Sequence, residues 1–309
     1  MRFGVVLPTY PGGATIDGFV RVAQAAEELG FASAWTTDHV IMTPEESGPY
    51  AEIFEGITTL AYLAGLTRTV TLGISVIVVP QRNGVILAKE LATLARFAPG
   101  RLVVGVGAGW NENEFRMLDA GDRFRRRGAY LDETIGLWRH LWAKPHEPFR
   151  TEFFNLPAVA FAPLPDEGPA LPIWVGGSSP AALRRAGRLG DAWHPVGSST
   201  DDIRRLTPAV YEAAEAAGRP HPLVAPRLAI EFDGADIHPA LVGRFPGLRG
   251  DDQTVADRLQ VYAEAGVDEV VCLFGTPDGK EAVRRMERFA RGVMPLVGST
   301  AAGRGGLTQ

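Results

Sequence analysis

The sequence is poor in cysteine, in metal-ligand spacings and in nucleophile motifs. Its 309 residues include a single cysteine, Cys272, which lies within the apolar run 270–274. One cysteine excludes an intramolecular disulfide and a cysteine-based metal cluster, and its apolar surroundings predict a core residue and not a nucleophile. The chain has no His-x-x-x-His pair and no Gly-x-Ser-x-Gly motif, so it predicts no metal centre and no nucleophile elbow.

Long apolar runs and a positive net charge are also missing. No apolar stretch approaches the ~20 residues that span a bilayer, and residues 1–8 lead into an expected strand without the cleavage site of a signal peptide. The formal net charge of −5 argues against nucleic acid or anionic membranes as partners. Residues 123–127 form a local basic cluster, for which we expect surface ion pairs. We therefore expect a cytoplasmic protein that acts on a small-molecule substrate.

Strand-like apolar runs alternate with segments of helical periodicity, which is typical of an α/β fold with a parallel sheet. Eight strands are expected, and eight βα units fit a closed (β/α)8 TIM barrel. They cover residues 3–8, 33–37, 70–76, 102–107, 172–175, 191–195, 226–232 and 269–273. We expect a single domain over 1–297, with rim insertions near 39–55 and 145–171 and a flexible tail over 298–309.

Two ionisable residues, Asp38 and His39, directly follow the second expected strand. The carboxyl ends of parallel strands carry the ligand site in open sheets and in β/α barrels. Histidine changes charge near neutral pH and an adjacent carboxylate could orient it, so the pair could move a proton or contact a polar cofactor edge. A helix-capping aspartate beside a structural histidine is the alternative, because short polar clusters after strands are common in loops.

The fourth expected strand ends in the alternate glycines Gly105, Gly107 and Gly109, and Trp110 and Glu114 follow. A dinucleotide-binding turn would have the spacing Gly-x-Gly-x-x-Gly and would lie in the first βα unit, so this motif does not indicate one. Alternate glycines leave one face of a strand bare, which allows a flat ring or another strand to approach closely. Ligand binding and close packing in the barrel both remain open for the glycines.

The clearest candidate for an anion site lies in residues 172–180. An apolar strand leads into Gly176, Gly177 and Ser178, and Pro180 suits the first turn of a helix. The amides at that helix start, the positive end of its dipole and the serine hydroxyls would hold a phosphate. A capped helix without a ligand is the alternative, although capping alone does not need a pair of glycines.

Further polar residues lie at the ends of later strands, on the same expected rim. His194 is part of the strand 191–195, and Glu231 is part of the strand 226–232. Together with Trp110 they are the candidate substrate contacts.

Several segments in this order resemble the bacterial luciferase-like superfamily, and within it the branch of coenzyme F420-dependent oxidoreductases. They are residues 2–5, 23–31, 37–39, 88–94, 105–110, 172–177 and 190–193. The likeness covers about residues 1–295.

The resemblance implies a TIM barrel that binds a flavin or a 5-deazaflavin at the carboxyl rim of the strands. It implies a non-proline cis peptide in a bulge after the third strand, and Asp38 and His39 beside the central ring. In the sugar-phosphate dehydrogenases of this superfamily an acidic residue directly follows the glycine-rich strand, whereas Trp110 stands there in this chain, which argues against a sugar-phosphate substrate. The implied cofactor contacts are Asp38, Ser75, Val76, Gly107, Gly109, Gly176, Gly177 and Ser178.

We therefore predict an oxidoreductase that transfers a hydride between coenzyme F420 and a small organic substrate. His39 would donate or accept a proton, Asp38 would orient it or contact the ring, and Glu114 could supply a carboxylate. One alternative is an FMN-dependent monooxygenase that uses reduced FMN from a separate reductase together with O2. A second alternative is a flavin-binding protein without turnover. The resemblance also implies a homodimer.

Overall fold

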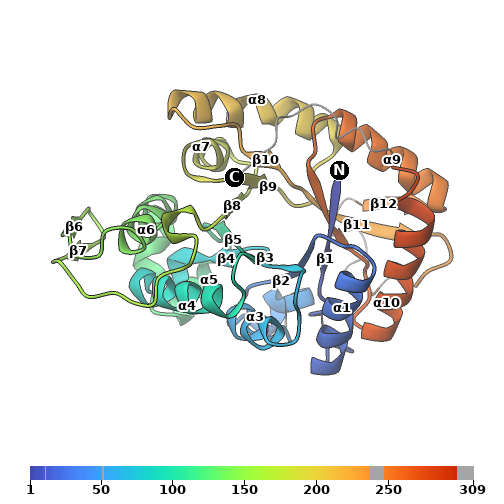
Figure 1. The fold of residues 1–309 in the computed structure, drawn as a ribbon, viewed down its shortest axis with the longest axis horizontal. Coiled ribbons are helices and arrows are strands. Elements are labelled where there is room, and N and C mark those ends of the chain that lie inside the picture. The colour runs from blue at the N-terminus through green and yellow to red at the C-terminus, as the bar shows by residue number, and fades with distance from the viewer. Residues whose placement is uncertain (11, 51, 237, 239–246, 298–309) are drawn as a thin grey trace.

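The computed structural model describes the whole chain except residues 11, 51, 237, 239–246 and 298–309 (Figure 1). The tail expected at 298–309 lies outside the described residues. Parallel strands form a curled sheet in the middle of the molecule, and helices surround it (Figure 1). Among the described residues no helix is both long and apolar enough to cross a membrane.

The sheet contains all eight predicted strands, and every pairing in it is parallel. Its neighbour order is β10-β9-β8-β5-β3-β2-β1-β13-β11-β12, with β4 beside β5. The strands are β1 Arg2–Val6, β2 Ser33–Thr36, β3 Thr71–Ile74, β4 Ile77–Val78, β5 Leu102–Gly107, β8 Ile173–Gly176, β9 Ala192–His194, β10 Leu223–Val224, β11 Arg227–Phe232, β12 Gly247–Gly250 and β13 Glu269–Leu273.

Backbone hydrogen bonds from the end of β9 to the segment that leads from β10 into β11 close the sheet into a ring. The Ala225 amide donates to the Trp193 carbonyl at 2.9 Å, and the Arg227 amide donates to the Pro195 carbonyl at 2.8 Å. The chain thus passes from β10, beside β9, directly into β11, which pairs with β13, and β13 pairs with β1. The predicted (β/α)8 barrel is confirmed.

Helices follow the strands and cover the outside of the barrel (Figure 1). Their inner faces and the outward side chains of the strands form one large core, in which Phe19, Val22, Ala23 and Ala26 of the first helix are buried. The helices are α1 Ile16–Glu28, α2 Pro44–Ser47, α3 Gly56–Ala64, α4 Gly84–Phe97, α5 Glu112–Met117, α6 Arg127–Leu141, α7 Pro180–Leu189, α8 Thr200–Ala216, α9 Asp252–Glu264 and α10 Gly279–Arg288.

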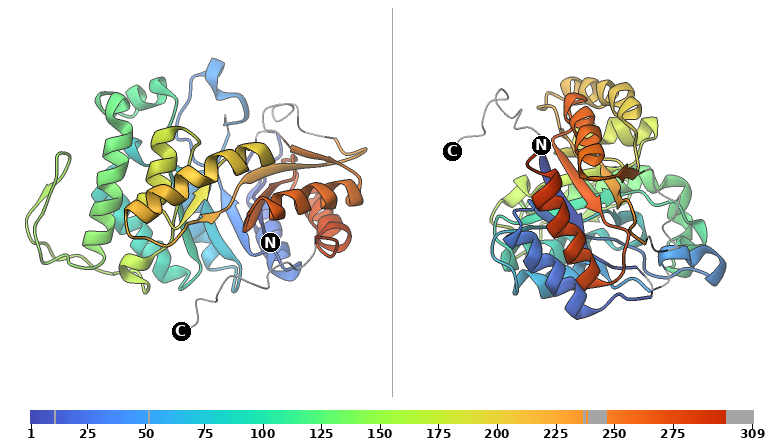
Figure 2. Two further views of the ribbon diagram at one scale, coloured as in Figure 1. Left: turned by 90° about the horizontal axis from the view of Figure 1, so that it is seen from above. Right: turned by 90° about the vertical axis from the view of Figure 1, so that its right-hand side faces the viewer.

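The two long connections lie in different places. Residues 39–55 contain α2 and the 3-10 turn Gly48–Tyr50, and this segment stands out beyond the barrel (Figure 2). Residues 145–171 carry a small antiparallel hairpin, β6 Phe149–Arg150 and β7 Asn155–Leu156, at the side of the molecule next to α6 (Figure 1). The hairpin segment is bound to α4 and to the start of α6 through Lys89–Ala162, Arg96–Asp166 and Arg126–Glu152 contacts. Only the first insertion therefore contributes to the rim described below.

Large aromatic side chains fill the barrel interior. The rings of Trp35 and Trp174 lie 4.7 Å apart between centroids, and both are buried. Glycine makes room for them, because a Cβ on Gly73 would lie 2.4 Å from the Trp35 ring. Cys272 is fully buried in the outer core, and burial raises the pKa of its thiol well above the usual range. Its predicted role as a core residue is confirmed.

A bulge interrupts the third strand of the barrel. Strand β3 ends at Ile74, the Ser75–Val76 peptide is cis, as the resemblance implied, and the chain resumes as β4 beside β5. The alternate glycines of β5 face this bulge. A Cβ on Gly105 would lie 1.9 Å from the Ile74 carbonyl oxygen, and one on Gly107 would lie 2.5 Å from Cγ2 of Val76. Close packing of strands therefore accounts for Gly105.

We predict that Gly105→Ala destabilises the protein by about 1–3 kcal/mol, because the new Cβ would collide with backbone that cannot rotate away. Gly65→Ala is the control, since Gly65 has a φ of −75° and the nearest atom to a Cβ there is 3.7 Å away. The control should change stability by less than about 0.5 kcal/mol. Urea unfolding measures both, and equal unfolding midpoints would contradict the packing argument.

Candidate functional site

A cavity of about 390 Å³ opens at the carboxyl ends of the strands. Most of the predicted site residues line this first cavity, and they come from the ends of β2, β5 and β8 and from the bulge after β3. They are Asp38, His39, Ser75, Val76, Gly107, Gly109, Trp110, Gly176, Gly177 and Ser178. The other three candidates, Glu114, His194 and Glu231, are not among its lining residues.

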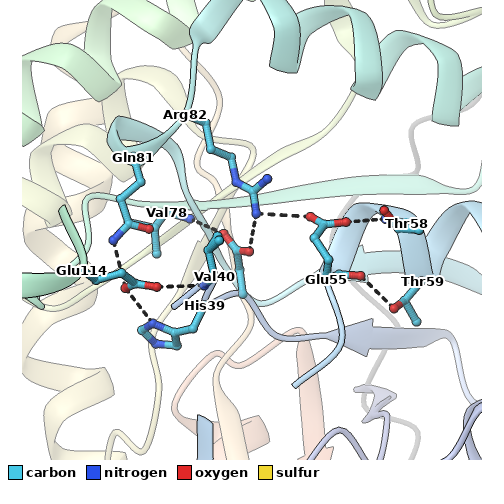
Figure 3. Close-up of polar contacts among 10 residues, drawn as sticks. His39, Val40, Glu55, Thr58, Thr59, Val78, Gln81, Arg82 and Glu114 are labelled. Atoms are coloured by element: carbon cyan, nitrogen blue, oxygen red, sulfur yellow. Dashed lines mark hydrogen bonds and ion pairs between the residues drawn. The ribbon is translucent and has the colours of Figure 1, made fainter. Parts of the chain in front are cut away.

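Asp38 fastens the bulge to the end of β2. Its side chain is buried, and its Oδ2 accepts a hydrogen bond from the Val78 amide at 2.9 Å. Its Oδ1 accepts from Nη2 of Arg82 at 2.6 Å, and the same nitrogen also reaches Glu55 (Figure 3). Both carboxylate oxygens of Asp38 are thus engaged away from His39. The structure gives the orienting role, which we expected for Asp38, to another residue.

Glu114 is that residue. Its Oε2 accepts from Nδ1 of His39 and from Nε2 of Gln81, each at 2.9 Å, and its Oε1 accepts from the Val40 amide at 2.8 Å (Figure 3). Glu114 lies in the first turn of α5, where its amide bonds to the side chain of the N-cap Asn111 at 3.1 Å. The carboxylate is 1% exposed. Glu114 therefore positions His39 and does not itself reach the cavity.

The protonation of Glu114 decides which nitrogen of His39 faces the cavity. Burial opposes its ionisation, but the hydrogen bonds from His39, Gln81 and the Val40 amide outweigh burial and lower the pKa of Glu114. An ionised carboxylate only accepts, so Nδ1 of His39 carries the hydrogen that it donates. Nε2 is then the nitrogen that can exchange a proton with a molecule in the cavity.

Two aromatic side chains stand beside the His39 ring. The centroid of Tyr50 lies 4.3 Å from that of His39, and Trp110 approaches edge-on at 5.9 Å. Trp110 remains 55% exposed, and both aromatic residues line the cavity. Tyr50 was not predicted, because it lies in the middle of an insertion and follows no strand.

His194 lies below the cavity floor. Its ring is fully buried and stacks on Trp35, its Nδ1 donates to the Ala225 carbonyl at 2.5 Å, and its Nε2 accepts from the Ser75 hydroxyl at 2.7 Å. Burial is the main cause that lowers the pKa of His194 to about 4. The residue is thus a neutral support for Ser75, and it does not line the cavity in which we expected it to contact the substrate.

Arg227 takes the place on β11 that we assigned to Glu231. Its side chain is buried, lines the cavity, donates from Nη1 to the Ser75 carbonyl at 3.3 Å and bonds to the Tyr10 hydroxyl. Glu231 lies four residues further along the same strand and is not part of the lining. Strand β11 carries two charged residues, Arg227 and Glu231, and nothing in the sequence distinguished Arg227 as the one that lines the cavity.

The start of α7, where the sequence predicts an anion site, forms one end of the cavity. Ser179 is the N-cap, and its Oγ accepts from the Ala182 amide at 3.3 Å, which leaves Gly176, Gly177 and Ser178 facing the cavity. Gly177 has a φ of +101°, a conformation that side chains rarely adopt. Helix capping and a ligand site thus occupy neighbouring residues, and the two interpretations are compatible.

Two arginines beside this helix start add positive charge. Arg127 donates from Nε to the Gly109 carbonyl at 3.1 Å, and Arg185 pairs with Asp132; both arginines line the cavity. Of the basic cluster 123–127, Arg126 makes the expected surface ion pair with Glu152, but Arg127 does not. No group of three or more His, Cys, Asp or Glu side chains in the described part of the chain could hold a metal ion.

A family model described as luciferase-like monooxygenase matches residues 1–233. This chain belongs to the luciferase-like monooxygenase family. The F420-dependent glucose-6-phosphate dehydrogenase of Kineococcus radiotolerans is 33% identical to this luciferase-like chain over 202 residues. That alignment covers 64% of this chain and 58% of the relative. The chain therefore matches less than two thirds of the length of this curated enzyme.

Solved structures support the fold of this luciferase-like protein. An F420-dependent secondary alcohol dehydrogenase in complex with an F420-acetone adduct superimposes with a TM-score of 0.80 at 20% identity, over 96% of this chain and 99% of the other. The oxygenating constituent of 3,6-diketocamphane monooxygenase from Pseudomonas putida, in complex with FMN, gives 0.78 at 18% identity, over 96% and 98%. At these identities the similarity establishes the barrel fold.

We predict that His194 makes the stability of the protein fall in mild acid. Its folded-state pKa of about 4 lies below the ordinary 6.5 of an unfolded chain, so the unfolded state binds more protons between these values. Stability should therefore drop by roughly 3 kcal/mol from this residue between pH 7 and pH 4. Denaturant unfolding of wild type and His194→Asn over this range isolates the effect, because the other titrating groups are shared. Parallel pH curves would contradict it.

Proposed function

We propose that this protein is an oxidoreductase that transfers a hydride between coenzyme F420 and a small organic substrate. The observation that carries the proposal is the arrangement of His39. It is held by a buried, ionised carboxylate and shares one cavity with a glycine-lined wall and an arginine-flanked helix start. The F420-dependent dehydrogenases among its relatives support the choice of cofactor.

The lining residues fit a flat ring that carries a phosphate. Gly107 and Gly176 flank the Val76 side chain. A Cβ on Gly107 would lie 2.5 Å from Cγ2 of Val76, which leaves no room for it, and a Cβ on Gly176 would lie 3.1 Å from Cγ1 of Val76, which is a tight contact. The ring would lie against the surface formed by Val76 and these glycines, and the phosphate would be held by Gly177, Ser178 and the nearby Arg127 and Arg185. When bound, coenzyme F420 supplies a ring that gives or takes a hydride.

The chain itself contributes orientation and a proton route. Oxidation of an alcohol to a carbonyl removes a hydride from carbon and a proton from oxygen, and Nε2 of His39 is placed to take that proton. Glu114 then stabilises the imidazolium that results, since its carboxylate already accepts from Nδ1. In the opposite direction the same nitrogen would return the proton to the substrate oxygen.

An FMN-dependent monooxygenase is the second candidate. The structural neighbour that holds FMN favours it, because the phosphate and ring sites described above would also suit FMN. Such an enzyme would need reduced FMN from a separate reductase. The flavin-binding protein without turnover is less well supported, because a carrier has no use for a histidine held in one tautomer by a buried carboxylate. A homodimer stays a prediction.

The cofactor is tested by titrating the purified protein with coenzyme F420 and with FMN. We expect binding of the deazaflavin and much weaker binding of FMN. Arg127→Gln should weaken deazaflavin binding by about tenfold or more, since hydrogen bonds to a charged group are worth ~1.5–3 kcal/mol. Arg126→Gln is the matched control, because its partner is Glu152 at the surface. Tight FMN binding without deazaflavin affinity would favour the monooxygenase instead.

The role of His39 is tested by turnover with a panel of secondary alcohols, followed by the change in deazaflavin absorbance. His39→Ala should lower kcat by about 10²–10⁴-fold, the usual contribution of a general acid–base. Glu114→Gln should lower it by about 10–100-fold, as expected for a residue that acts through its neighbour. Glu112→Gln, on the exposed side of the same helix, is the control. Unchanged kcat in His39→Ala would refute the proton route, and unchanged cofactor affinity in all variants would show that binding is intact.

A further inference from the structure

A second cavity, of about 370 Å³, lies next to the first. His39 and Tyr50 line both cavities, and their rings, which are tilted by 42° with centroids 4.3 Å apart, separate the two. The remaining lining comes entirely from the insertion after β2. It consists of Val40, Ile41, Met42, Pro44, Ser47 and Ile53.

The second cavity differs from the first in charge. Three arginines line the first cavity. None of the described residues around the second is Lys, Arg, Asp or Glu, and apart from Ser47, Tyr50 and His39 the lining is apolar. Val40 and Ile41 are 49% and 47% exposed, which is much for large apolar side chains that are adjacent in sequence.

The polar surroundings of His39 would also repel an anion. The carboxylate that touches its ring, Glu114, is ionised, and Glu46 lies on the same insertion as the apolar lining. A phosphorylated or carboxylated substrate in the second cavity would meet no cation among the described lining residues. It would also lose its hydration, which is costly for an unpaired charge.

The second cavity is held open by hydrogen bonds. Glu46 accepts from Nδ2 of Asn111 at 3.2 Å and from Nδ2 of Asn113 at 3.0 Å, and the Val40 amide donates to Glu114 at 2.8 Å. The start and the middle of the lining segment are thus fastened to α5 and its N-cap residue. A site with fixed walls loses less entropy on binding than a loop that must first order.

We propose that this second cavity binds the apolar body of an uncharged substrate and presents its hydroxyl or carbonyl oxygen to Nε2 of His39. The inference rests on the proposed function for the chemistry at His39. Binding of the apolar body depends only on the chain itself. The expected ligands are neutral aliphatic or alicyclic alcohols and ketones, in contrast to sugar phosphates.

The test is calorimetric titration of the protein without cofactor. The probes are butan-2-one, hexan-2-one and octan-2-one, with hexanoate and glucose 6-phosphate as charged comparators. Affinity for the ketones should rise by about fourfold per methylene until the cavity is filled. Hexanoate should bind at least tenfold more weakly than hexan-2-one, and glucose 6-phosphate should not compete. Affinity that is independent of ketone length, or equal binding of hexanoate, would overturn the proposal.

Variants locate the binding. Met42→Asp should weaken octan-2-one binding at least tenfold, and the uncharged Met42→Gln should weaken it by a smaller factor. The second variant keeps the test decisive if the aspartate impairs folding. Met117→Asp is the matched control, because Met117 is 41% exposed on α5 and is not part of either lining. Equal loss in Met42→Asp and Met117→Asp would overturn the proposal.

The same protein samples distinguish two further outcomes. If octan-2-one binds as expected but neither coenzyme F420 nor FMN does, the substrate cavity is supported and the proposed function fails. If Met42→Asp splits a dimer in size-exclusion chromatography while leaving ketone affinity unchanged, the apolar segment is an interface between copies of the chain, and the substrate proposal is overturned.

Discussion

The site depends on the close approach of the bulge after β3 to the bare backbone of β5. The Ile74 carbonyl occupies the space where Gly105 would carry a side chain. This approach fixes where Ser75 and Val76 point, and three polar groups then hold the bulge from different sides. Asp38 binds the Val78 amide, His194 binds the Ser75 hydroxyl, and Arg227 binds the Ser75 carbonyl. The cavity floor is therefore held to the barrel by hydrogen bonds from three different strand ends or strands.

A second set of contacts passes from the insertion through α5 to His39. Helix α5 has only six residues, too few to be stable by itself, and Asn111 stabilises it by capping its start. The same asparagine donates to Glu46 on the insertion, while the carboxylate of Glu114, one turn on, accepts from His39 and from the Val40 amide. The helix cap and the histidine partner lie within four residues, so the same short segment contacts both the insertion and His39.

The strands and the residues at their ends were predictable from the sequence because both depend on local patterns. Buried parallel strands are continuous apolar runs, and Asp38, Gly176 and Ser178 follow such runs directly. The partner of His39 was not predictable, because it depends on which of several carboxylates the fold brings near, and Glu114 is 75 positions away. The cavity arginines Arg127 and Arg185 were missed for the same reason. The segment 145–171 was assigned to the rim on its length, and length does not tell at which side of the barrel a connection runs.

The position of Trp110 connects the charge pattern of the site with the substrate. An acidic residue directly after the glycine-rich strand would place a second proton-transfer group at the cavity wall. In this chain a tryptophan stands there, and the carboxylate of Glu114 is withdrawn behind His39, where it accepts three hydrogen bonds. His39, with a side chain that is 9% exposed, is therefore the proton-transfer group of this wall, beside the rings of Tyr50 and Trp110. Such a wall matches a substrate that exchanges a single proton and is otherwise apolar. A charged group in the wall would have to lose its water when an apolar substrate binds, and this desolvation is costly. The tryptophan and the apolar insertion thus point to the same kind of ligand through independent parts of the chain.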